Sequence, residues 1–135
     1  MKIAVAGLGY VGLSNALLLS MHNEVVAFDI DSEKVMMLNK KKSPIDDKEI
    51  EEYLHKETIN FRATNNENEA YKDAVYVIIS TPTDYDEKND FFNTKSIEQV
   101  IERVLKINPS TTMVIKSTIP VGYVNKVRKT FKTNN

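Results

Sequence analysis

Six consecutive residues near the start of the chain, Gly7 to Gly12, have the types and the spacing of a phosphate-binding turn. Their sequence, GLGYVG, follows the pattern G-x-G-x-x-G. Gly7 would allow a sharp turn, and Gly9 has no side chain to keep the backbone away from a pyrophosphate. Gly12 would let a following helix pack tightly, and the amino end of such a helix attracts anions. The turn therefore predicts a phosphorylated ligand.

The segments on either side decide whether this is more than a common glycine bend. Residues 2–6, KIAVA, form an apolar run typical of a buried strand, and residues 13–21, LSNALLLSM, are apolar at helical spacing. A second strand-like run, EVVAF at 24–28, ends at Asp29. Strand, glycine turn, helix, strand and acid follow in the order that a dinucleotide-binding βαβ unit requires. This agreement favours nucleotide binding over a purely structural turn.

The acid after the second strand indicates which dinucleotide is bound. The Asp29 carboxylate can accept hydrogen bonds from the adenosine ribose, and its charge would repel a 2′-phosphate, so we predict NAD rather than NADP. Asp31 could also hold the ribose, but its position beyond the end of the strand favours a role as the cap of the next helix. Lys34 lies in the first turn of the next helix, near the expected adenosine, where a solvated lysine is an equally good interpretation.

Composition indicates one domain and excludes several classes of protein. A chain of 135 residues can form one domain with its own core. Its formal net charge of −1 does not indicate binding to nucleic acid or to a membrane surface, so neither is a predicted partner. There is no cysteine, and hence no disulfide framework or thiol nucleophile in this segment. Glycines and Asn15 interrupt the apolar N-terminus, so we expect a cytoplasmic protein without a signal peptide or membrane span.

The rest of the chain alternates between helix and strand patterns. Helices are predicted at residues 32–39, 47–56, 66–74 and 96–107, and strands at 58–63, 75–80 and 111–115. The strand at 75–80, VYVIIS, should be central and buried on both faces. Right-handed crossovers then give an α/β fold, a Rossmann-type doubly wound parallel sheet with strand order 3-2-1-4-5 and helices on both faces.

Local signals set two of the helix starts. Asp46 and Glu49 fit a capping box that would open the helix at 47–56. Pro120 would begin a last helix, because its missing N–H costs nothing in the first turn. The residues expected to form the buried stripe of that helix are Val124, Val127 and Phe131.

Polar residues follow two of the predicted strands, at the edge where doubly wound sheets bind ligands. Thr83, in the T-P-T turn after 75–80, is either a hydroxyl for the cofactor or a simple turn residue, and Ser117 and Thr118 follow 111–115. The loop at 84–93, DYDEKNDFFN, fits a functional flap, an interdomain contact or a plain surface loop. His22 and His55 have no clustered partner, so no metal site is predicted.

Four motifs in order resemble one enzyme family. They are MKIAVAGLGYVGL, EVVAFDID with a following lysine, VIISTPT and IKSTIPVG. Together they are similar to the N-terminal NAD-binding domain of the UDP-glucose/GDP-mannose dehydrogenase family, which includes UDP-glucose 6-dehydrogenase. SPIDDKEIEEYL also resembles the helix after the second strand in bacterial members, and the similarity covers essentially the whole chain.

The resemblance implies a reaction and a set of roles. Family members oxidise C6 of a nucleotide sugar twice with two NAD molecules, through thiohemiacetal and thioester intermediates on a cysteine, so that UDP-glucose becomes UDP-glucuronate. By this resemblance Asp29 would hold the ribose and Lys34 would lie beside the adenosine. Thr83 would contact the nicotinamide half of the cofactor, and Thr118 would lie beside the nicotinamide and help to position the catalytic water. The residues that would line the pyrophosphate are Gly7, Gly9, Tyr10, Val11 and Gly12.

The catalytic cysteine of the family, its lysine, asparagine and aspartate partners, and the active-site glutamates lie later in the family's sequence. So do the sugar-nucleotide domain and the helix that joins members into dimers. We therefore expect residues 1–135 to be a truncated NAD-binding Rossmann domain that binds NAD but oxidises UDP-glucose only with the missing C-terminal half. We expect a homodimer for the full-length enzyme and a monomer for this chain, with the exposed edge of the fifth strand as a contact site.

Alternatives stay open at this point. Dehydrogenases of UDP-N-acetylmannosamine or GDP-mannose share the motifs, although the overall similarity favours UDP-glucose. A non-enzymatic NAD-sensing Rossmann module of a potassium transporter or channel has a similar length and opening, and fold analogy cannot separate it. The T-P-T and K-S-T-I-P-V-G segments favour the dehydrogenase. A methyltransferase would also place an acid after the second strand, but the full glycine spacing argues against it.

Overall fold

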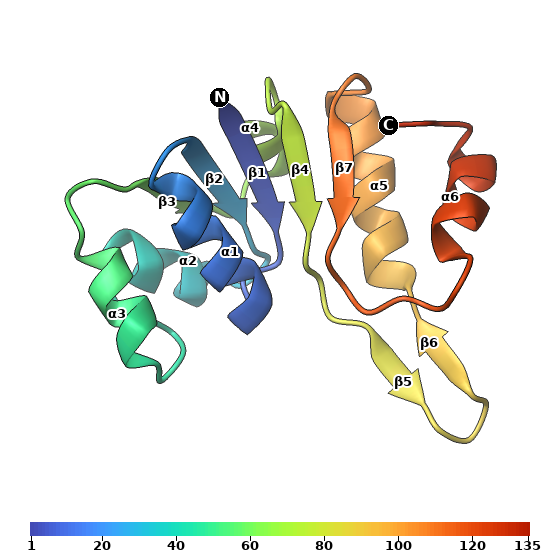
Figure 1. Cartoon of the computed structure of the whole chain (residues 1–135), viewed down its shortest axis with the longest axis horizontal. Helices are drawn as coiled ribbons and strands as arrows, with labels where there is room; N and C mark the ends of the chain where they lie inside the picture. The colour runs from blue at the N-terminus through green and yellow to red at the C-terminus, as the bar shows by residue number, and fades with distance from the viewer.

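The computed structural model describes residues 1–135 as a parallel sheet flanked by helices (Figure 1). Five strands pair in the order β3-β2-β1-β4-β7, and every pairing is parallel. Because β7 is the fifth of these strands along the chain, the predicted order 3-2-1-4-5 is confirmed. The strands are β1 (Lys2–Ala6), β2 (Glu24–Phe28), β3 (Asn60–Thr64), β4 (Tyr76–Ile79) and β7 (Thr112–Ile115).

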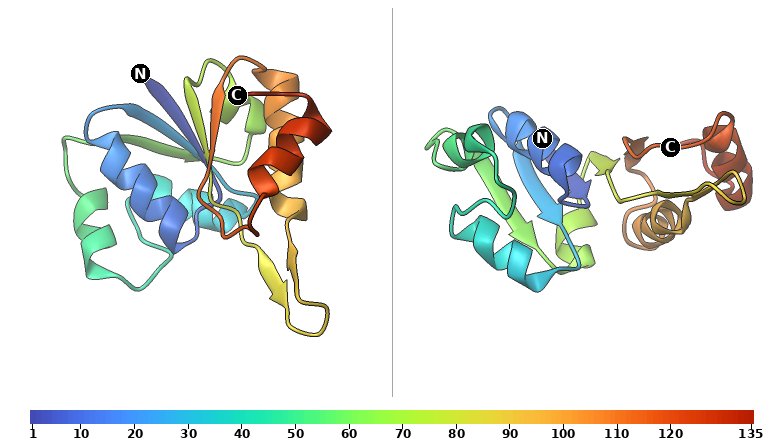
Figure 2. Two further views of the ribbon diagram at one scale, coloured as in Figure 1. Left: turned by 45° about the vertical axis from the view of Figure 1, so that its right-hand side comes forward. Right: turned by 90° about the horizontal axis from the view of Figure 1, so that it is seen from below.

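Helices lie on both faces of the sheet (Figure 2), and each face carries its own hydrophobic core. Alternation along β1 supplies both cores, since Ile3 and Val5 pack into one and Ala4 and Ala6 into the other. No helix is long and apolar enough to cross a bilayer. The helices of the first face are α1 (Tyr10–Ser20), α2 (Ser32–Asn39) and α3 (Lys48–Leu54), and those of the second are α4 (Glu67–Tyr71), α5 (Lys95–Ile107) and α6 (Tyr123–Phe131).

The strand register brings the carboxyl ends of the inner strands to one level. Ala6 is paired with Phe28 of β2 and with Ile79 of β4. The next residue, Gly7, donates its N–H to the Phe28 carbonyl oxygen at 2.9 Å. The segments that follow these strands, namely the glycine turn, Asp29 and the T-P-T turn, therefore meet at a single edge of the sheet.

The predicted capping box of α3 is wrong by one residue. Asp47 caps this helix, and its side chain accepts hydrogen bonds from the N–H groups of Glu49 and Ile50. Asp46 is exposed and takes no part in the cap. The acid adjacent to the first helical residue is the one whose oxygen reaches the free N–H groups of the first turn.

The last helix also starts later than predicted. Gly122 precedes α6 with φ at 83°, a left-handed conformation that ends any helical path back to Pro120. The first helical residue is Tyr123, which is buried together with Val127, whereas Val124 is 40% exposed. Tyr123 and Val127, which are four residues apart and share one face of the helix, form its buried side, so Val124 is not part of the core.

The strand β4 is central in the sheet, as predicted, but only one of its two faces is fully buried. Val77 and Ile79 are fully buried, whereas Tyr76 is exposed. The prediction of burial on both faces is therefore wrong for the face that carries Tyr76 and Ile78, where Ile78 is only partly buried. The helices of this face pack beside β1, β2 and β3, and Val114, the register partner of Ile78 on β7, is exposed as well.

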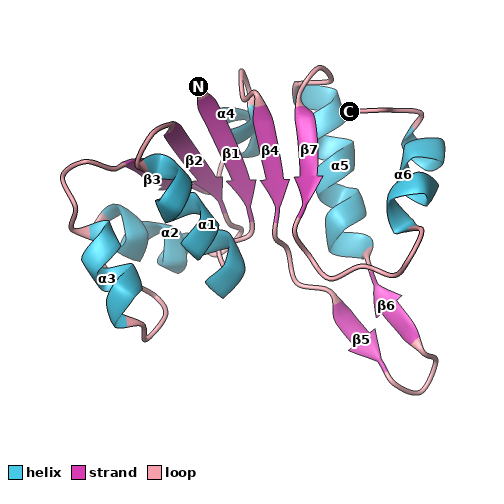
Figure 3. Cartoon of the chain, in the orientation of Figure 1, coloured by secondary structure: helices cyan, strands magenta, loops and turns pink.

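Residues 84–93 form a β-hairpin where a loop was predicted. β5 (Asp84–Asp86) pairs antiparallel with β6 (Phe91–Asn93), apart from the main sheet (Figure 3). The rings of Tyr85 and Phe92 pack with their centroids 4.8 Å apart, and the Tyr85 hydroxyl donates a hydrogen bond to the Asp90 carboxylate. The hairpin projects past the carboxyl end of the sheet in both Figure 1 and Figure 2. Strands of three residues are too short for alternation to reveal them in the sequence.

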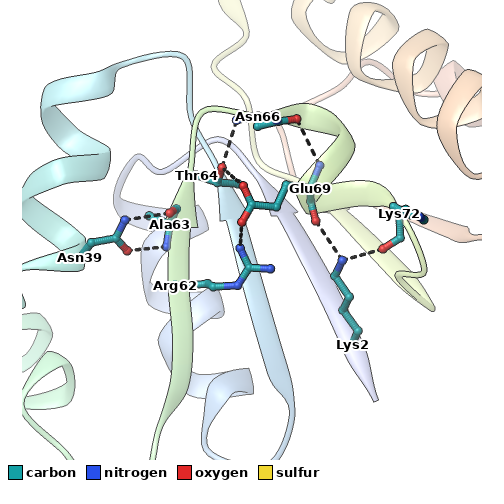
Figure 4. A network of polar contacts seen from close by, with 8 residues as sticks. All are labelled: Lys2, Asn39, Arg62, Ala63, Thr64, Asn66, Glu69 and Lys72. Atoms are coloured by element: carbon teal, nitrogen blue, oxygen red, sulfur yellow. Dashed lines mark hydrogen bonds and ion pairs between the residues drawn. The ribbon is translucent and has the colours of Figure 1, made fainter.

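A polar network ties α4 to β3 and β1 (Figure 4). The Glu69 carboxylate accepts a hydrogen bond from the Thr64 hydroxyl at 2.9 Å and pairs with Arg62. The Lys2 ammonium donates to the carbonyl oxygens of Glu69, at 2.9 Å, and Lys72, at 2.5 Å. The Thr64 hydrogen bond, helped by the Arg62 charge, lowers the pKa of Glu69 below its ordinary value of 4.5.

Candidate functional site

A cavity of about 690 Å³ lies along the carboxyl end of the sheet. Its walls come from the segments that follow β1, β2, β4 and β7 and from the beginning of α4 and α5. This is the edge at which doubly wound sheets bind ligands. The predicted site residues that line it are Gly7, Gly9, Tyr10, Val11, Asp29, Lys34, Thr83 and Thr118.

The bend between β1 and α1 is tight enough to require two glycines. Gly7 has φ at 93°, and a Cβ atom on it would lie 2.8 Å from the Ser80 carbonyl oxygen. A Cβ atom on Gly12 would lie 1.8 Å from the Gly7 carbonyl oxygen. Gly12 is the one predicted site residue that does not line the cavity, because its task is to bring α1 against the bend.

Gly9 and the start of α1 face open space. A Cβ atom on Gly9 would meet no atom within 4 Å. No side chain caps α1, and the N–H groups of Tyr10 and Val11 have no acceptor within the chain. Unpaired N–H groups at the start of an eleven-residue helix, beside an open space, suit the oxygens of a phosphate group.

Asp29 is held at the end of β2 by two backbone hydrogen bonds. Its Oδ2 accepts from the Leu8 N–H and its Oδ1 from the Asp31 N–H, both at 2.9 Å. The Lys34 ammonium lies 3.8 Å from Oδ2, and the Asp29 side chain is only 12% exposed. Each carboxylate oxygen retains a lone pair that can accept from a ribose hydroxyl. Asp31 caps α2 through the N–H groups of Glu33 and Lys34, as the sequence predicted.

Hydroxyl groups join the ends of β4 and β7 across the other half of the cavity. The Thr83 hydroxyl donates to the Thr118 carbonyl oxygen at 2.8 Å. The Ser117 hydroxyl donates to the Thr81 carbonyl oxygen at 2.6 Å. These bonds place Thr83 beside Thr118, although the two residues are far apart along the chain.

A third segment joins this half from α5. The Ser96 hydroxyl donates to the Pro82 carbonyl oxygen at 2.7 Å and lies 3.0 Å from the Thr81 hydroxyl oxygen. Ser96 stands where α5 begins, directly after the β5–β6 hairpin. The T-P-T turn is therefore held on both sides, by Ser96 and by Ser117.

Residues 1–135 match one domain family along their whole length. It is the NAD binding domain of the UDP-glucose/GDP-mannose dehydrogenase family. The chain belongs to this family. The match confirms the predicted family and NAD as its cofactor.

Relatives of this dehydrogenase family cover the whole chain. The chain is 46% identical to UDP-glucose 6-dehydrogenase of Campylobacter jejuni, over 100% of this chain and 35% of that protein. It is 48% identical to UDP-glucose 6-dehydrogenase of Streptococcus pneumoniae, over 99% of this chain and 34% of that protein. The chain thus spans about a third of the length of these curated relatives.

Solved structures from the same family share the fold. A ternary complex of GDP-mannose dehydrogenase from Pseudomonas aeruginosa gives a TM-score of 0.84 at 30% identity, over 94% of this chain and 30% of that one. UDP-D-ManNAc dehydrogenase from Pyrococcus horikoshii gives 0.86 at 30% identity, over 98% of this chain and 32% of that one. These likenesses confirm the Rossmann-type fold predicted from the sequence.

The cavity has the chemical features that the NAD of this family needs. The open space at Gly9 and the free N–H groups of Tyr10 and Val11 suit a pyrophosphate. Asp29 offers carboxylate oxygens to a ribose, and Thr83 brings a hydroxyl to the opposite half. The residues present therefore fit the cofactor.

Several lining residues gave no signal in the sequence. Ser96 and Gln99 belong to α5, where the spacing of the apolar residues predicts the buried face but gives no role to the polar residues. Glu67 lies in the first turn of α4, where an acid is explained by the helix dipole alone. Ser117 was noted as a polar residue after the strand at 111–115 and Lys116 only as part of the K-S-T motif, and neither observation pointed to their partners.

Proposed function

We propose that the whole protein oxidises UDP-glucose to UDP-glucuronate, with two NAD molecules as hydride acceptors. The observation that carries this is the identity of 46% and 48% to two proteins named UDP-glucose 6-dehydrogenase, over at least 99% of this chain. The structures named for GDP-mannose and UDP-D-ManNAc are 30% identical to it. Those two sugar nucleotides are the alternative substrates within the family.

In this proposal NAD lies along the cavity from the β2 side to the β7 side. Its pyrophosphate binds at Gly9, Tyr10 and Val11, on the bend that Gly7 and Gly12 make possible. Asp29 holds the adenosine ribose, with Lys34 beside it. The nicotinamide half reaches the paired strand ends, where Thr83 contacts it and Thr118 helps to position the water that releases the product. When bound, NAD supplies the hydride acceptor.

The proposal places the cofactor site and the catalytic cysteine in different parts of the full-length protein. Residues 1–135 carry the cofactor site, and the family resemblance assigns the cysteine and the sugar-nucleotide site to the remaining two thirds of the relatives' length. A homodimeric full-length enzyme, a monomeric chain of 135 residues and a cytoplasmic location stay predictions. The family match argues against the potassium-transporter module and the methyltransferase.

The cofactor site is tested by a calorimetric titration with NADH and NADPH. We expect NADPH to bind at least about tenfold more weakly, because its 2′-phosphate would meet the Asp29 carboxylate. Asp29→Asn, which keeps an acceptor for the Leu8 N–H, should narrow this difference and weaken NADH binding. Asp31→Asn, at an exposed cap, is the matched control and should leave the ratio unchanged. NADPH binding as tight as NADH would refute the role of Asp29.

The substrate is tested on the full-length protein. Its kcat/KM should be highest for UDP-glucose among UDP-glucose, UDP-N-acetylmannosamine and GDP-mannose, with two NADH formed per sugar consumed. The 135-residue chain, which has no cysteine, should form no NADH from UDP-glucose. A higher kcat/KM for another sugar nucleotide would make that compound the substrate in place of UDP-glucose. NADH formation by the 135-residue chain would show that the reaction does not need a cysteine from the rest of the protein.

A further inference from the structure

The cavity continues past Asp29 into a cleft between the β2–α2 connection and α5. Ile30, which is 86% exposed, lines the cleft from the first of these, and buried Val100 lines it from the second. Phe28 and Gln99 complete the lining beside them. Apolar side chains contributed by two separate elements suit a flat aromatic ring.

Glu67 brings a carboxylate to the lining of the same cavity, and it also borders a second hollow together with Phe28 and Arg103. Among the residues that line the cavity, Asp29 and Glu67 are the acids, and Glu67 comes from the start of α4. Its Oε2 lies 3.5 Å from Nε of Arg103 on α5, and its side chain is 33% exposed. Glu67 makes no hydrogen bond through its side chain within the protein, so Oε1 is free to accept one. Arg103 thus orients a carboxylate whose second oxygen has no partner.

We propose that Glu67 recognises the 6-amino group of the adenine base and makes the site selective for adenine dinucleotides. This inference rests on the proposed NAD site, because the base must lie next to the ribose that Asp29 holds. Adenine presents an N–H donor at position 6, whereas hypoxanthine presents a carbonyl oxygen there. A carboxylate can only accept hydrogen bonds, so it attracts the first group and repels the second.

Calorimetry with NAD+ and its deaminated analogue, nicotinamide hypoxanthine dinucleotide, tests the assignment. We expect the wild-type chain to bind NAD+ about tenfold more tightly than the analogue, since leaving a polar group mispaired beneath the bound base costs about this much. Glu67→Gln can donate its amide N–H to the hypoxanthine oxygen, so the ratio should fall to about two, mainly through tighter binding of the analogue. Glu67→Asp keeps the charge but withdraws it by one methylene, and the preference should fall there as well.

Glu102→Gln is the matched control. Glu102 lies on α5 outside the cavity and pairs with Lys106 at 2.9 Å, so its replacement should leave the ratio at the wild-type value. Thermal melting of each variant verifies that it is folded. Equal wild-type affinities for the two dinucleotides, or an unchanged ratio in Glu67→Gln, would overturn the role of Glu67 while NAD+ binding itself upheld the proposed site. Failure of the folded wild-type chain to bind either dinucleotide would overturn the site and this inference together.

Discussion

The two halves of the cavity are built in different ways. The half at β1 and β2 comes from one contiguous stretch, in which the glycine bend, the start of α1 and Asp29 are joined mainly through backbone groups. The half at β4 and β7 is assembled from three remote segments, which Thr83, Ser96 and Ser117 tie together through side-chain hydroxyls. The first half suits a diphosphate common to all dinucleotides, and the second depends on single hydroxyl groups, whose loss should cost less stability than a side chain added at a closely packed glycine.

Burial follows the same division. Ala6 and Leu8, on either side of Gly7, are fully inaccessible to solvent. On the other half, the T-P-T turn leads into the projecting hairpin, and Val114 of β7 is exposed at the open edge of the sheet. We therefore expect substitutions at the closely packed glycines, Gly7 and Gly12, to disrupt folding and binding together, whereas single substitutions in the hydroxyl half should have smaller effects on both.

The largest expected effect comes from Gly12→Ala. The new methyl would overlap the Gly7 carbonyl oxygen at 1.8 Å, and relieving that overlap requires movement of the backbone between α1 and β1. We expect a loss of about 3 kcal/mol or more in the free energy of unfolding and no measurable NADH binding. Urea denaturation and NADH fluorescence would measure the two effects.

Gly9→Ala is the paired variant that separates binding from folding. Its methyl meets no protein atom, so the free energy of unfolding should change by no more than about 1 kcal/mol. NADH affinity should nevertheless fall about tenfold, because the methyl enters the space meant for the pyrophosphate. Unchanged NADH binding by this variant would mean that the diphosphate lies elsewhere.

An intermediate effect is expected for Ser117→Ala. The substitution removes the 2.6 Å hydrogen bond to the Thr81 carbonyl oxygen and should lower stability by about 1 kcal/mol. NADH affinity should fall about threefold as the T-P-T turn loosens. Ser110→Ala, whose exposed hydroxyl is bonded only to Asn108, is the control and should change neither quantity. An effect as severe as that of Gly12→Ala would contradict the contrast between the halves.

The smallest effect is expected at the network around Glu69, which lies outside the cavity (Figure 4). Glu69→Gln should leave NADH binding unchanged and lower the melting temperature by about 2 °C at neutral pH. Because the pKa of Glu69 is lowered in the folded state, its stabilisation is present above about pH 4.5 and is lost as the pH falls through the folded-state pKa. The difference from wild type should therefore shrink between pH 5 and about pH 3 in thermal melts. A difference that grew in acid would reverse the sign of this linkage.

The contiguous half of the site and the order of the strands could both be predicted from the sequence. Gly7, Gly12 and Asp29 could be predicted because their requirements are local: a positive φ, a close helix approach, and an acid at a strand end. The repeat of apolar residues likewise predicted those strands and helices whose buried side can be recognised within a short stretch of the sequence.

The contacts between segments that are remote in the sequence could be seen only in the folded chain. The spacing of apolar residues cannot predict the pairing of Thr83 with Thr118 or the unpaired oxygen of Glu67. Both depend on the strand register and on the crossover connections. The hairpin at 84–93 and the late start of α6 were missed for a related reason. Three-residue strands and a single left-handed glycine leave too short a pattern to outweigh the signals on either side.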